Sequence, residues 1–276
     1  MRYGIILTTG NIHEMIDMAA EAEAAGWDGV FYWDAIAIPG MAPIYDPWVT
    51  LAAFAMRTER VRLGNIITPP SRRRPWKLAR ETATLDHLSG GRLVLPVGLG
   101  ALDDVGFGGV GEATEARTRA EVLDESLEIL TRAWSGEPFR HEGKHYQTAE
   151  MAMQPPSLQQ PRIPIWVVGV WPRPRSVDRA LRYDGIIPQV TAEGGGPGRV
   201  TPDQVRAIAD LARERRGEGE PFDIVIGDVS PGDDVEAARA IVQPLAEAGA
   251  TWWIESPWMD ATVASLRARI AAGPPR

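Results

Sequence analysis

Short apolar runs alternate along this chain with longer segments whose apolar residues recur every three or four positions. The first run, Tyr3–Thr8, is apolar throughout its centre, which is typical of a strand buried on both faces. Gly26 ends the segment that follows, because glycine readily adopts the left-handed conformation of a helix C-terminus. The apolar residues of that segment lie on one helix face: Ile12, Met15, Ile16, Ala19 and Ala22. The pattern therefore predicts one strand followed by one helix.

The same unit recurs through the chain. The predicted strands are Tyr3–Thr8, Gly29–Trp33, Val61–Ile67, Leu93–Val97, Ile163–Gly169, Gly185–Gln189, Phe222–Gly227 and Thr251–Glu255. The predicted helices include Trp76–His87, Ser176–Tyr183, Pro202–Arg216 with Thr201 as N-cap, one near Asp260–Ala271, one opened by Asp46-Pro47, and two with in-phase apolar residues at Leu123–Trp134 and Val235–Leu245. Alternation on this short a period indicates parallel βα units.

Eight units without a break favour a closed α/β structure, a (β/α)8 barrel, over an open doubly wound sheet. The 276 residues suit one barrel domain spanning residues 1–276, for which roughly 250 residues are typical. The fourth and fifth strands are separated by an insertion, at about residues 101–160, that includes a polar hairpin at Pro138–Gln147. We expect the insertion and a mobile loop, Gly194–Gly198, beside the C-terminal strand ends, which form the mouth of the barrel.

Composition narrows the function. A formal charge of −8 argues against nucleic-acid binding, which usually requires a basic surface. The run Arg72-Arg73-Arg74 is too short to change this and is interpreted as a solvated or oligomer-interface loop. The chain has no cysteine, which excludes disulfides and thiolate chemistry. No segment is long and apolar enough to span a membrane, and the N-terminus resembles a strand rather than a signal peptide, so we expect a cytoplasmic protein.

Active sites of such barrels form at the C-terminal strand ends, which restricts the candidates. Asp34 follows the second strand and is our candidate catalytic residue, as a base if burial raises its pKa; a loop-bracing role is the alternative. Glu255 carries the same ambiguity. Gly98 and Gly100 permit either a tight turn or close approach to a ring system. Substrate contacts are predicted from position at Trp33, Tyr45 and Trp48.

The loop after the fifth strand is a candidate phosphate site. It leads into a helix whose first N–H groups are unpaired, and two arginines could add charge-assisted bonds; the alternative is a solvated loop with Ser176 as N-cap. The predicted contacts are Gly169, Val170, Trp171, Arg173, Arg175 and Ser176.

Other motifs carry no chemistry. The G-x-G-x-x-G match at Gly106–Gly111 does not sit between a strand and a helix, as dinucleotide binding requires, and is interpreted as a flexible loop. The four histidines, His13, His87, His141 and His145, lie away from the mouth, so no metal centre is predicted.

Five stretches of the sequence resemble luciferase-like flavin-dependent oxidoreductases: Ala19–Asp34, Asp46–Gly64, Arg73–Gly100, the insertion ending in HEGKHYQ, and Pro161–Gly185. The resemblance implies FMN, or the deazaflavin F420, at the mouth of a (β/α)8 barrel. It implies that the flavin ring lies against the end of the third strand, where members often carry a bulge or a non-prolyl cis peptide. That end comprises Asn65, Ile66, Ile67 and Thr68. It further implies phosphate bound at Gly169–Ser176 and a homodimer.

Two departures from the family are visible. Many members have a histidine after the second-strand acidic residue, where this chain has Ala35. Members that use F420 often have Gly-Glu after the fourth strand, where this chain has Gly100-Ala101.

The leading hypothesis is an oxidoreductase or monooxygenase that uses FMN or F420 to oxidise or reduce a small organic substrate, with a separate flavin reductase as an expected partner. Two alternatives stay open. One is a non-catalytic flavin-binding protein. The other is a lyase or isomerase with a phosphorylated substrate and Asp34 or Glu255 as base.

Overall fold

The structure is a computed structural model that describes residues 1–41, 43–192, 194–258 and 261–276. The chain forms two compact units. Unit 1 comprises residues 1–31, 60–62 and 165–276, and unit 2 comprises residues 32–59 and 63–164. Asp260, the predicted start of the last helix, lies outside the described residues.

Unit 1 contains most of the parallel sheet. Its strands are β1 (Arg2–Ile6), β2 (Gly29–Tyr32), β5 (Ile165–Val170), β6 (Gly185–Thr191), β8 (Asp223–Asp228) and β9 (Trp252–Glu255), of which the last residue of β2 belongs to unit 2. They pair in the order β2-β1-β9-β8-β6-β5, all parallel. The two-residue β7 (Pro197–Gly198) pairs antiparallel with β6, so part of the loop predicted to be mobile is instead held in a hairpin.

The helices of unit 1 are α1 (Ile12–Ala24), α5 (Pro174–Leu181), α6 (Pro202–Arg216), α7 (Val235–Glu247) and α8 (Val263–Ala271). Most of them begin at a side chain that caps them, α5 being the exception. Asn11, Thr201 and Thr262 each form a capping box, which satisfies first-turn N–H groups. The prediction for α6 and its N-cap Thr201 is confirmed.

Aromatic rings fill the core of unit 1. The ring of Trp166 lies 5.9 Å from that of Phe31 and 5.3 Å from that of Trp252. Glycine makes room for them: a Cβ on Gly29 would lie 2.7 Å from the Phe31 ring, and one on Gly185 would lie 2.7 Å from the Trp166 ring. These glycines are therefore packing positions.

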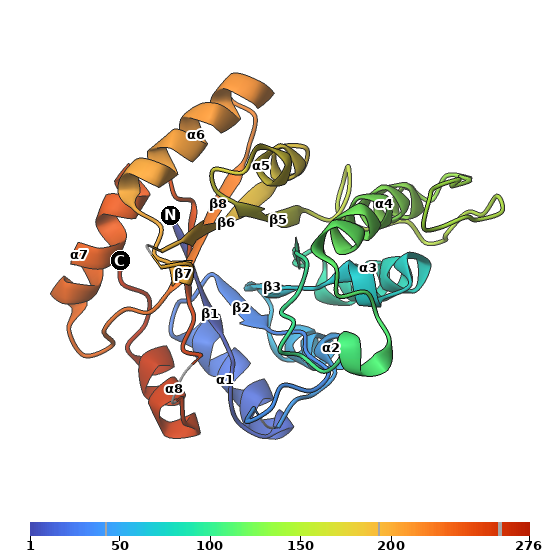
Figure 1. Ribbon diagram of the computed structural model, residues 1–276. Helices are drawn as coiled ribbons and strands as arrows, with labels where there is room; N and C mark the ends of the chain where they lie inside the picture. Colours follow the sequence, from blue (N-terminus) through green and yellow to red (C-terminus); the bar gives the residue numbers. More distant parts are fainter. Residues whose placement is uncertain (42, 193, 259–260) are drawn as a thin grey trace. The chain divides into compact units, whose positions relative to one another are not determined.

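Unit 2 contains two strands and the longest helix in the described part of the chain. Its elements are α2 (Pro47–Arg57), β3 (Arg62–Asn65, whose first residue belongs to unit 1), the 3-10 turn η1 (Pro70–Arg72), α3 (Pro75–Ser89), β4 (Leu95–Val97), the 3-10 turn η2 (Gly108–Val110) and α4 (Ala116–Ser135). Helices α3 and α4 lie side by side (Figure 1), and Trp134 Nε1 donates to Thr82 Oγ1 between them (3.0 Å). Antiparallel bridges Phe139–Met151 and Glu142–Gln147 confirm the predicted hairpin.

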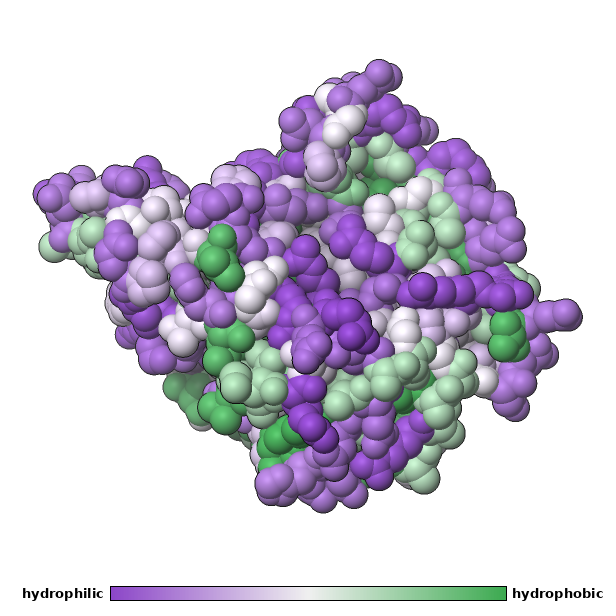
Figure 2. Space-filling view, turned by 180° about the vertical axis from the view of Figure 1, so that it is seen from behind, coloured by the Kyte–Doolittle hydropathy of each residue, from purple (hydrophilic) through white to green (hydrophobic). Residues whose placement is uncertain are grey.

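The strand order makes the sheet close on itself. It runs β3-β2-β1-β9-β8-β6-β5-β4, and its two end strands are joined by parallel bridges at Leu63–Leu93 and Thr68–Val97. Within the described residues, eight parallel strands alternate with eight helices, which is the (β/α)8 barrel class predicted from the sequence. In the described part of the chain, no helix is both long enough and apolar enough to cross a membrane. The face drawn in Figure 2 is mostly hydrophilic, with separate small hydrophobic patches.

Candidate functional site

Backbone hydrogen bonds in unit 2 join the ends of β2, β3 and β4. The N–H of Ile66 donates to the carbonyl of Tyr32 (2.8 Å), and that of Thr68 donates to the carbonyl of Pro96 (2.9 Å). The N–H of Gly98 in turn donates to the Thr68 carbonyl (3.2 Å). The structure therefore brings together the predicted site residues that follow these three strands.

The peptide bond between Ile66 and Ile67 is cis, although neither residue is proline. It lies within Asn65–Thr68, where the family resemblance implies such a bond, and this expectation is confirmed. Both isoleucines are partly buried.

Two polar side chains flank this peptide and lack partners. Asn65 and Thr68 are fully buried. Among the described residues, no hydrogen-bond partner is found for the side-chain oxygen and nitrogen of Asn65 or for the hydroxyl of Thr68. Leaving such a group unpaired costs about 1–3 kcal/mol, and buried polar atoms are rarely left so. The end of β3 thus has unused donors and acceptors, which fit the polar edge of a flavin-type ring.

Asp34 lies in an ion-pair cluster, which we define as Asp34, Arg72, Arg73 and Asp104. Its side chain is fully buried. Oδ1 accepts a hydrogen bond from Arg72 Nη2 (2.9 Å), and Oδ2 accepts from Arg73 Nη2 (2.7 Å) and Nε (3.0 Å). Because each oxygen is already bonded to a guanidinium, the contacts favour the loop-bracing role of Asp34 over that of a base.

Asp104 is the second carboxylate of the cluster and is bonded to Arg72. It also accepts from the backbone N–H groups of Ile36 (3.0 Å), Ala37 (2.9 Å) and Gly106 (2.9 Å). Burial alone would raise the pKa of Asp104, but these N–H groups and the guanidinium outweigh it and lower the pKa from 3.8 to about 2. Asp104 therefore stays ionised at neutral pH.

One interpretation from the sequence is wrong here. Arg72 is not solvated: its side chain is 3% exposed and paired with two carboxylates. Asp104 and Phe107, at the start of the Gly106–Gly111 loop, are buried. Only Arg74 of the arginine run is exposed. Sequence reasoning missed Asp104, since an aspartate in a Gly/Asp-rich loop has no periodicity that reveals burial.

The backbone of Gly100 approaches side chains of its own unit. Its φ is +79°, and a Cβ there would lie 2.5 Å from the Phe107 ring and 2.9 Å from Pro69. Arg119, 5% exposed, donates to the carbonyls of Leu99 (2.6 Å) and Gly100 (3.1 Å). This packing alone explains why position 100 is glycine, and no contact with a ligand is needed to explain it. Gly98 is buried.

Of the three predicted substrate residues, Trp48 contacts the ion-pair cluster, whereas Trp33 and Tyr45 contact Tyr32. The guanidinium of Arg73 lies over the Trp48 ring at 5.8 Å. The Trp33 ring packs 5.9 Å from that of Tyr32, whose hydroxyl accepts a hydrogen bond from the Tyr45 N–H (3.1 Å). Trp33 and Trp48 are buried, whereas Tyr45 is partly exposed.

The loop after β5, in unit 1, differs from its prediction. Helix α5 begins at Pro174 with Arg173 as N-cap, so Ser176 is neither the N-cap nor the first helical residue. Proline at the first position fits a helix start because it lacks an N–H. Ser176 Oγ instead accepts from the N–H of Val170 (2.9 Å). Arg173 and Arg175 are exposed and available to an anion.

Two more residues of this loop pack within unit 1. Trp171 packs against a cluster of Val177, Leu181 and Ala212. A Cβ on Gly169 would lie 2.5 Å from Ile186. Packing within unit 1 therefore explains the residue type at both positions, Trp171 and Gly169.

Glu255, the other candidate base, is fully engaged in unit 1. It is 1% exposed and accepts from Ser230 N–H (2.6 Å), Ser230 Oγ (2.8 Å), Trp253 Nε1 (3.0 Å) and Arg269 Nη2 (3.1 Å). These contacts favour a structural role.

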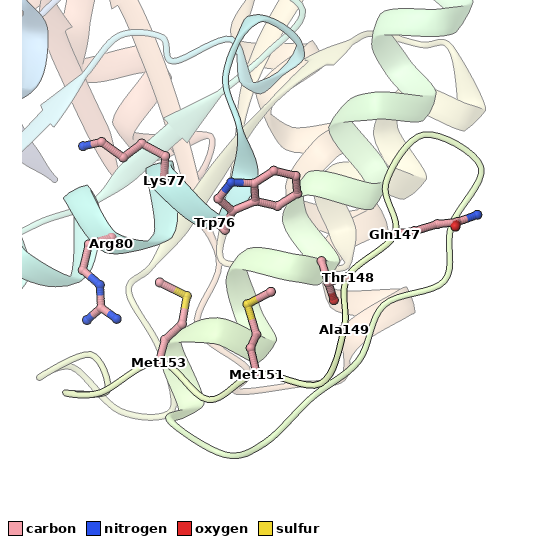
Figure 3. Close-up of a pocket in the computed structure, with 8 residues that line it drawn as sticks. All are labelled: Trp76, Lys77, Arg80, Gln147, Thr148, Ala149, Met151 and Met153. Atoms are coloured by element: carbon pink, nitrogen blue, oxygen red, sulfur yellow. The ribbon is translucent and has the colours of Figure 1, made fainter.

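Unit 2 also carries a shallow groove of about 660 Å³ beside α3. Figure 3 shows its lining, which combines apolar and basic side chains: Trp76, Lys77, Arg80, Gln147, Thr148, Ala149, Met151 and Met153. None of the predicted site residues lines it. Within the described ranges, no group of three or more His, Asp or Glu side chains is arranged to hold a metal ion.

Known proteins similar to this chain share its fold and its family. A monooxygenase, RslO1 from Streptomyces bottropensis, superposes with a TM-score of 0.79 at 22% identity, over 99% of this chain and 98% of that one. An F420-dependent secondary alcohol dehydrogenase, solved with an F420-acetone adduct, also has a TM-score of 0.79, at 17% identity, over 98% and 97% of the two chains. At these identities the likeness shows the fold alone.

Sequence relatives are closer. The F420-dependent glucose-6-phosphate dehydrogenase of Microbacterium testaceum is 33% identical over 206 residues, which is 72% of this chain and 58% of that protein. That of Rhodococcus erythropolis is 30% identical over 233 residues, 82% of this chain and 66% of its own length. The match thus spans less than two thirds of these relatives. The model of the luciferase-like monooxygenase family matches residues 1–273, and the chain therefore belongs to that family.

Proposed function

We propose that this protein is an oxidoreductase that binds F420 or FMN at the strand ends of its barrel and oxidises or reduces a small organic substrate. The observation that carries the proposal is the pair of buried side chains without partners, Asn65 and Thr68, beside the cis peptide at the end of β3. Family membership gives the class of ligand. When bound, the cofactor supplies hydride transfer as F420, or oxygen activation as reduced FMN.

The protein's own residues orient and shield the ring. Asn65 and Thr68 would form hydrogen bonds with its polar edge, and the backbone of Ile66-Ile67 would lie beside it. Gly98 and Gly100 would line the neighbouring segment after β4. In unit 1, the exposed Arg173 and Arg175, with Val170 and Ser176, are proposed contacts for the cofactor phosphate. Trp33, Tyr45 and Trp48 are proposed to contact the substrate.

F420 is the first cofactor to test, because the relatives above are named as F420-dependent. Their phosphorylated sugar is one candidate substrate. The contacts of Asp34 and Glu255 disfavour the lyase or isomerase hypothesis, since both carboxylates that could serve as its base are bonded to arginine. A non-catalytic flavin-binding protein would bind the cofactor with similar affinity but would not turn over a substrate.

The deciding experiment titrates the purified protein with F420, FMN and FAD and follows tryptophan fluorescence. Micromolar binding of F420 or FMN is expected, and substrate-dependent reoxidation or reduction of the bound cofactor then separates an enzyme from a carrier. Absence of binding to all three would end the proposal.

We further propose a homodimer. Helix α2 exposes Val49 (69%) and Met56 (71%), two turns apart on one face, which would be buried in a subunit contact. Met56→Glu is expected to shift the protein from dimer to monomer in sedimentation velocity. An unchanged sedimentation coefficient would contradict this interface.

Residues 1–276 are proposed to act as one domain, since the family model runs through both units. A separate flavin reductase would be needed only for the FMN reaction with oxygen. The cytoplasmic location stays a prediction.

A further inference from the structure

Arg72 is a buried cation between two buried carboxylates. Its Nη2 donates to Asp34 Oδ1 (2.9 Å) and to the Asp34 carbonyl (2.7 Å), and its Nη1 donates to Asp104. The side chains of all three residues are at most 3% exposed. A guanidinium placed between two carboxylates so far from water holds both in fixed geometry.

The ion-pair cluster fixes the segment after β2 at two points. Arg72 binds Asp34 itself, and Asp104 accepts the N–H groups of Ile36 and Ala37. Between these points lies Ala35, whose methyl group can make no hydrogen bond. In this chain the geometry of the segment therefore depends on the cluster.

The same arginine connects the segments after β3 and β4. Arg72 ends η1, only four residues beyond Thr68. Its guanidinium lies 5.0 Å from the centre of the Phe107 ring, and Arg119 lies 5.3 Å from that ring. Since Arg119 also binds the carbonyls of Leu99 and Gly100, one chain of contacts reaches all three strand-end segments of unit 2.

The charges do not favour proton transfer within this chain of contacts. The oxygens of Asp34 accept hydrogen bonds from Arg72 and Arg73, and those of Asp104 accept from Arg72 and from three backbone N–H groups. Carboxylates engaged in this way suit orientation and not acid–base chemistry.

We propose that Arg72 and Asp104 are positioning residues: through Asp34 and the backbone after β3, they hold the segments of unit 2 that bind the flavin-type cofactor. This inference rests on the proposed function. In this proposal, Arg72 and Asp104 do not contact the cofactor themselves, but they set its affinity by holding the segments that bind it.

The test uses Asp104→Asn, which keeps the shape of the side chain, and Arg72→Lys, which keeps its charge but not its fork. Arg74→Met, in the exposed member of the same arginine run, is the matched control. Each variant is titrated with F420 and FMN, and hydrogen exchange is measured at the amides of Ile36, Ala37 and Gly106. Circular dichroism and a cooperative thermal transition establish that each variant is folded.

We expect Asp104→Asn and Arg72→Lys to weaken cofactor binding about tenfold or more, as loss of a supporting contact commonly does. Exchange at the three amides is expected to rise in Asp104→Asn, and Arg74→Met is expected to match wild type in both readouts. If wild type binds a cofactor and the folded variants Asp104→Asn and Arg72→Lys bind it as tightly as Arg74→Met does, this inference is overturned and the proposed function is not. Wild-type protein that binds neither cofactor would overturn the proposed function, and this inference with it.

Discussion

Thr68 and Thr82 are both fully buried threonines, but only Thr82 is satisfied. Its hydroxyl donates toward the carbonyls of Leu78 (2.7 Å) and Ala79 (3.1 Å) and accepts from Trp134, whereas that of Thr68 has no partner among the described residues. This contrast supports the proposed contact between Thr68 and the cofactor.

This contrast predicts opposite effects of one substitution. Thr68→Val should leave the free energy of unfolding unchanged or raise it by about 1 kcal/mol, because an unpaired buried hydroxyl is removed, and should weaken F420 or FMN binding. Thr82→Val should lower the free energy of unfolding by about 1–2 kcal/mol without changing affinity. Urea denaturation and fluorescence titration measure the two effects. Equal destabilisation by both variants would argue against a ligand role for Thr68.

Asp104 makes stability depend on acid pH. Its pKa is lowered from 3.8 to about 2 on folding, so the folded state binds its proton less tightly than the unfolded state. The stabilisation is complete above about pH 4 and is lost as pH falls through about 2. At neutral pH it amounts to about 2 kcal/mol. Unfolding of wild type and Asp104→Asn should therefore differ most at neutral pH and converge towards pH 2. A difference that does not depend on pH would show that the Asp104 charge is unimportant.

At the scale of elements, one carboxylate holds the hairpin of residues 138–151 against α4. Glu125 accepts from the N–H groups of Lys144 (2.9 Å), His145 (3.0 Å) and Tyr146 (2.9 Å). Burial opposes its charge, but these donors prevail and lower its pKa. A Cβ on Gly143 would lie 2.2 Å from the same carboxylate, so glycine is required at the turn.

Glu125→Gln should loosen this hairpin, because a neutral amide replaces the charge that all three N–H groups share. Faster hydrogen exchange at residues 144–146 is expected, with a loss of about 1–3 kcal/mol in the free energy of unfolding. Glu128→Gln, on the same helix, is the control, since that carboxylate is half exposed and pairs with Arg132. Equal protection in both variants would mean that the hairpin is held by its apolar contacts.

For the whole molecule, cofactor binding is expected to add stability. A ligand that binds only the folded state at about one hundred times its Kd stabilises it by about 2.7 kcal/mol. Thermal unfolding with F420, FMN and no cofactor should therefore rank the two by affinity. The same rise in Asp104→Asn as in wild type, at one cofactor concentration, would contradict its role as a positioning residue.

Much of this architecture follows from the sequence itself, because strand and helix periodicity are local. The alternating βα units, the N-caps Asp46 and Thr201 and the hairpin in the insertion depend on residues within a few positions of each other. The cis peptide at Ile66-Ile67 could be expected only through resemblance to the family, since isoleucine by itself does not favour that geometry.

Only the tertiary structure decided which side chains meet. Asp34 and Arg72 are 38 residues apart, and Arg72 and Asp104 are 32 apart, so no local pattern distinguishes a buried arginine from its exposed neighbour Arg74. Likewise, only the structure shows that Trp171 packs against the Val177 cluster and that Ser176 accepts a hydrogen bond from Val170, both within unit 1. Hydrophobic order along a chain determines which elements form, whereas the pairing of charges depends on the folded packing that removes them from water.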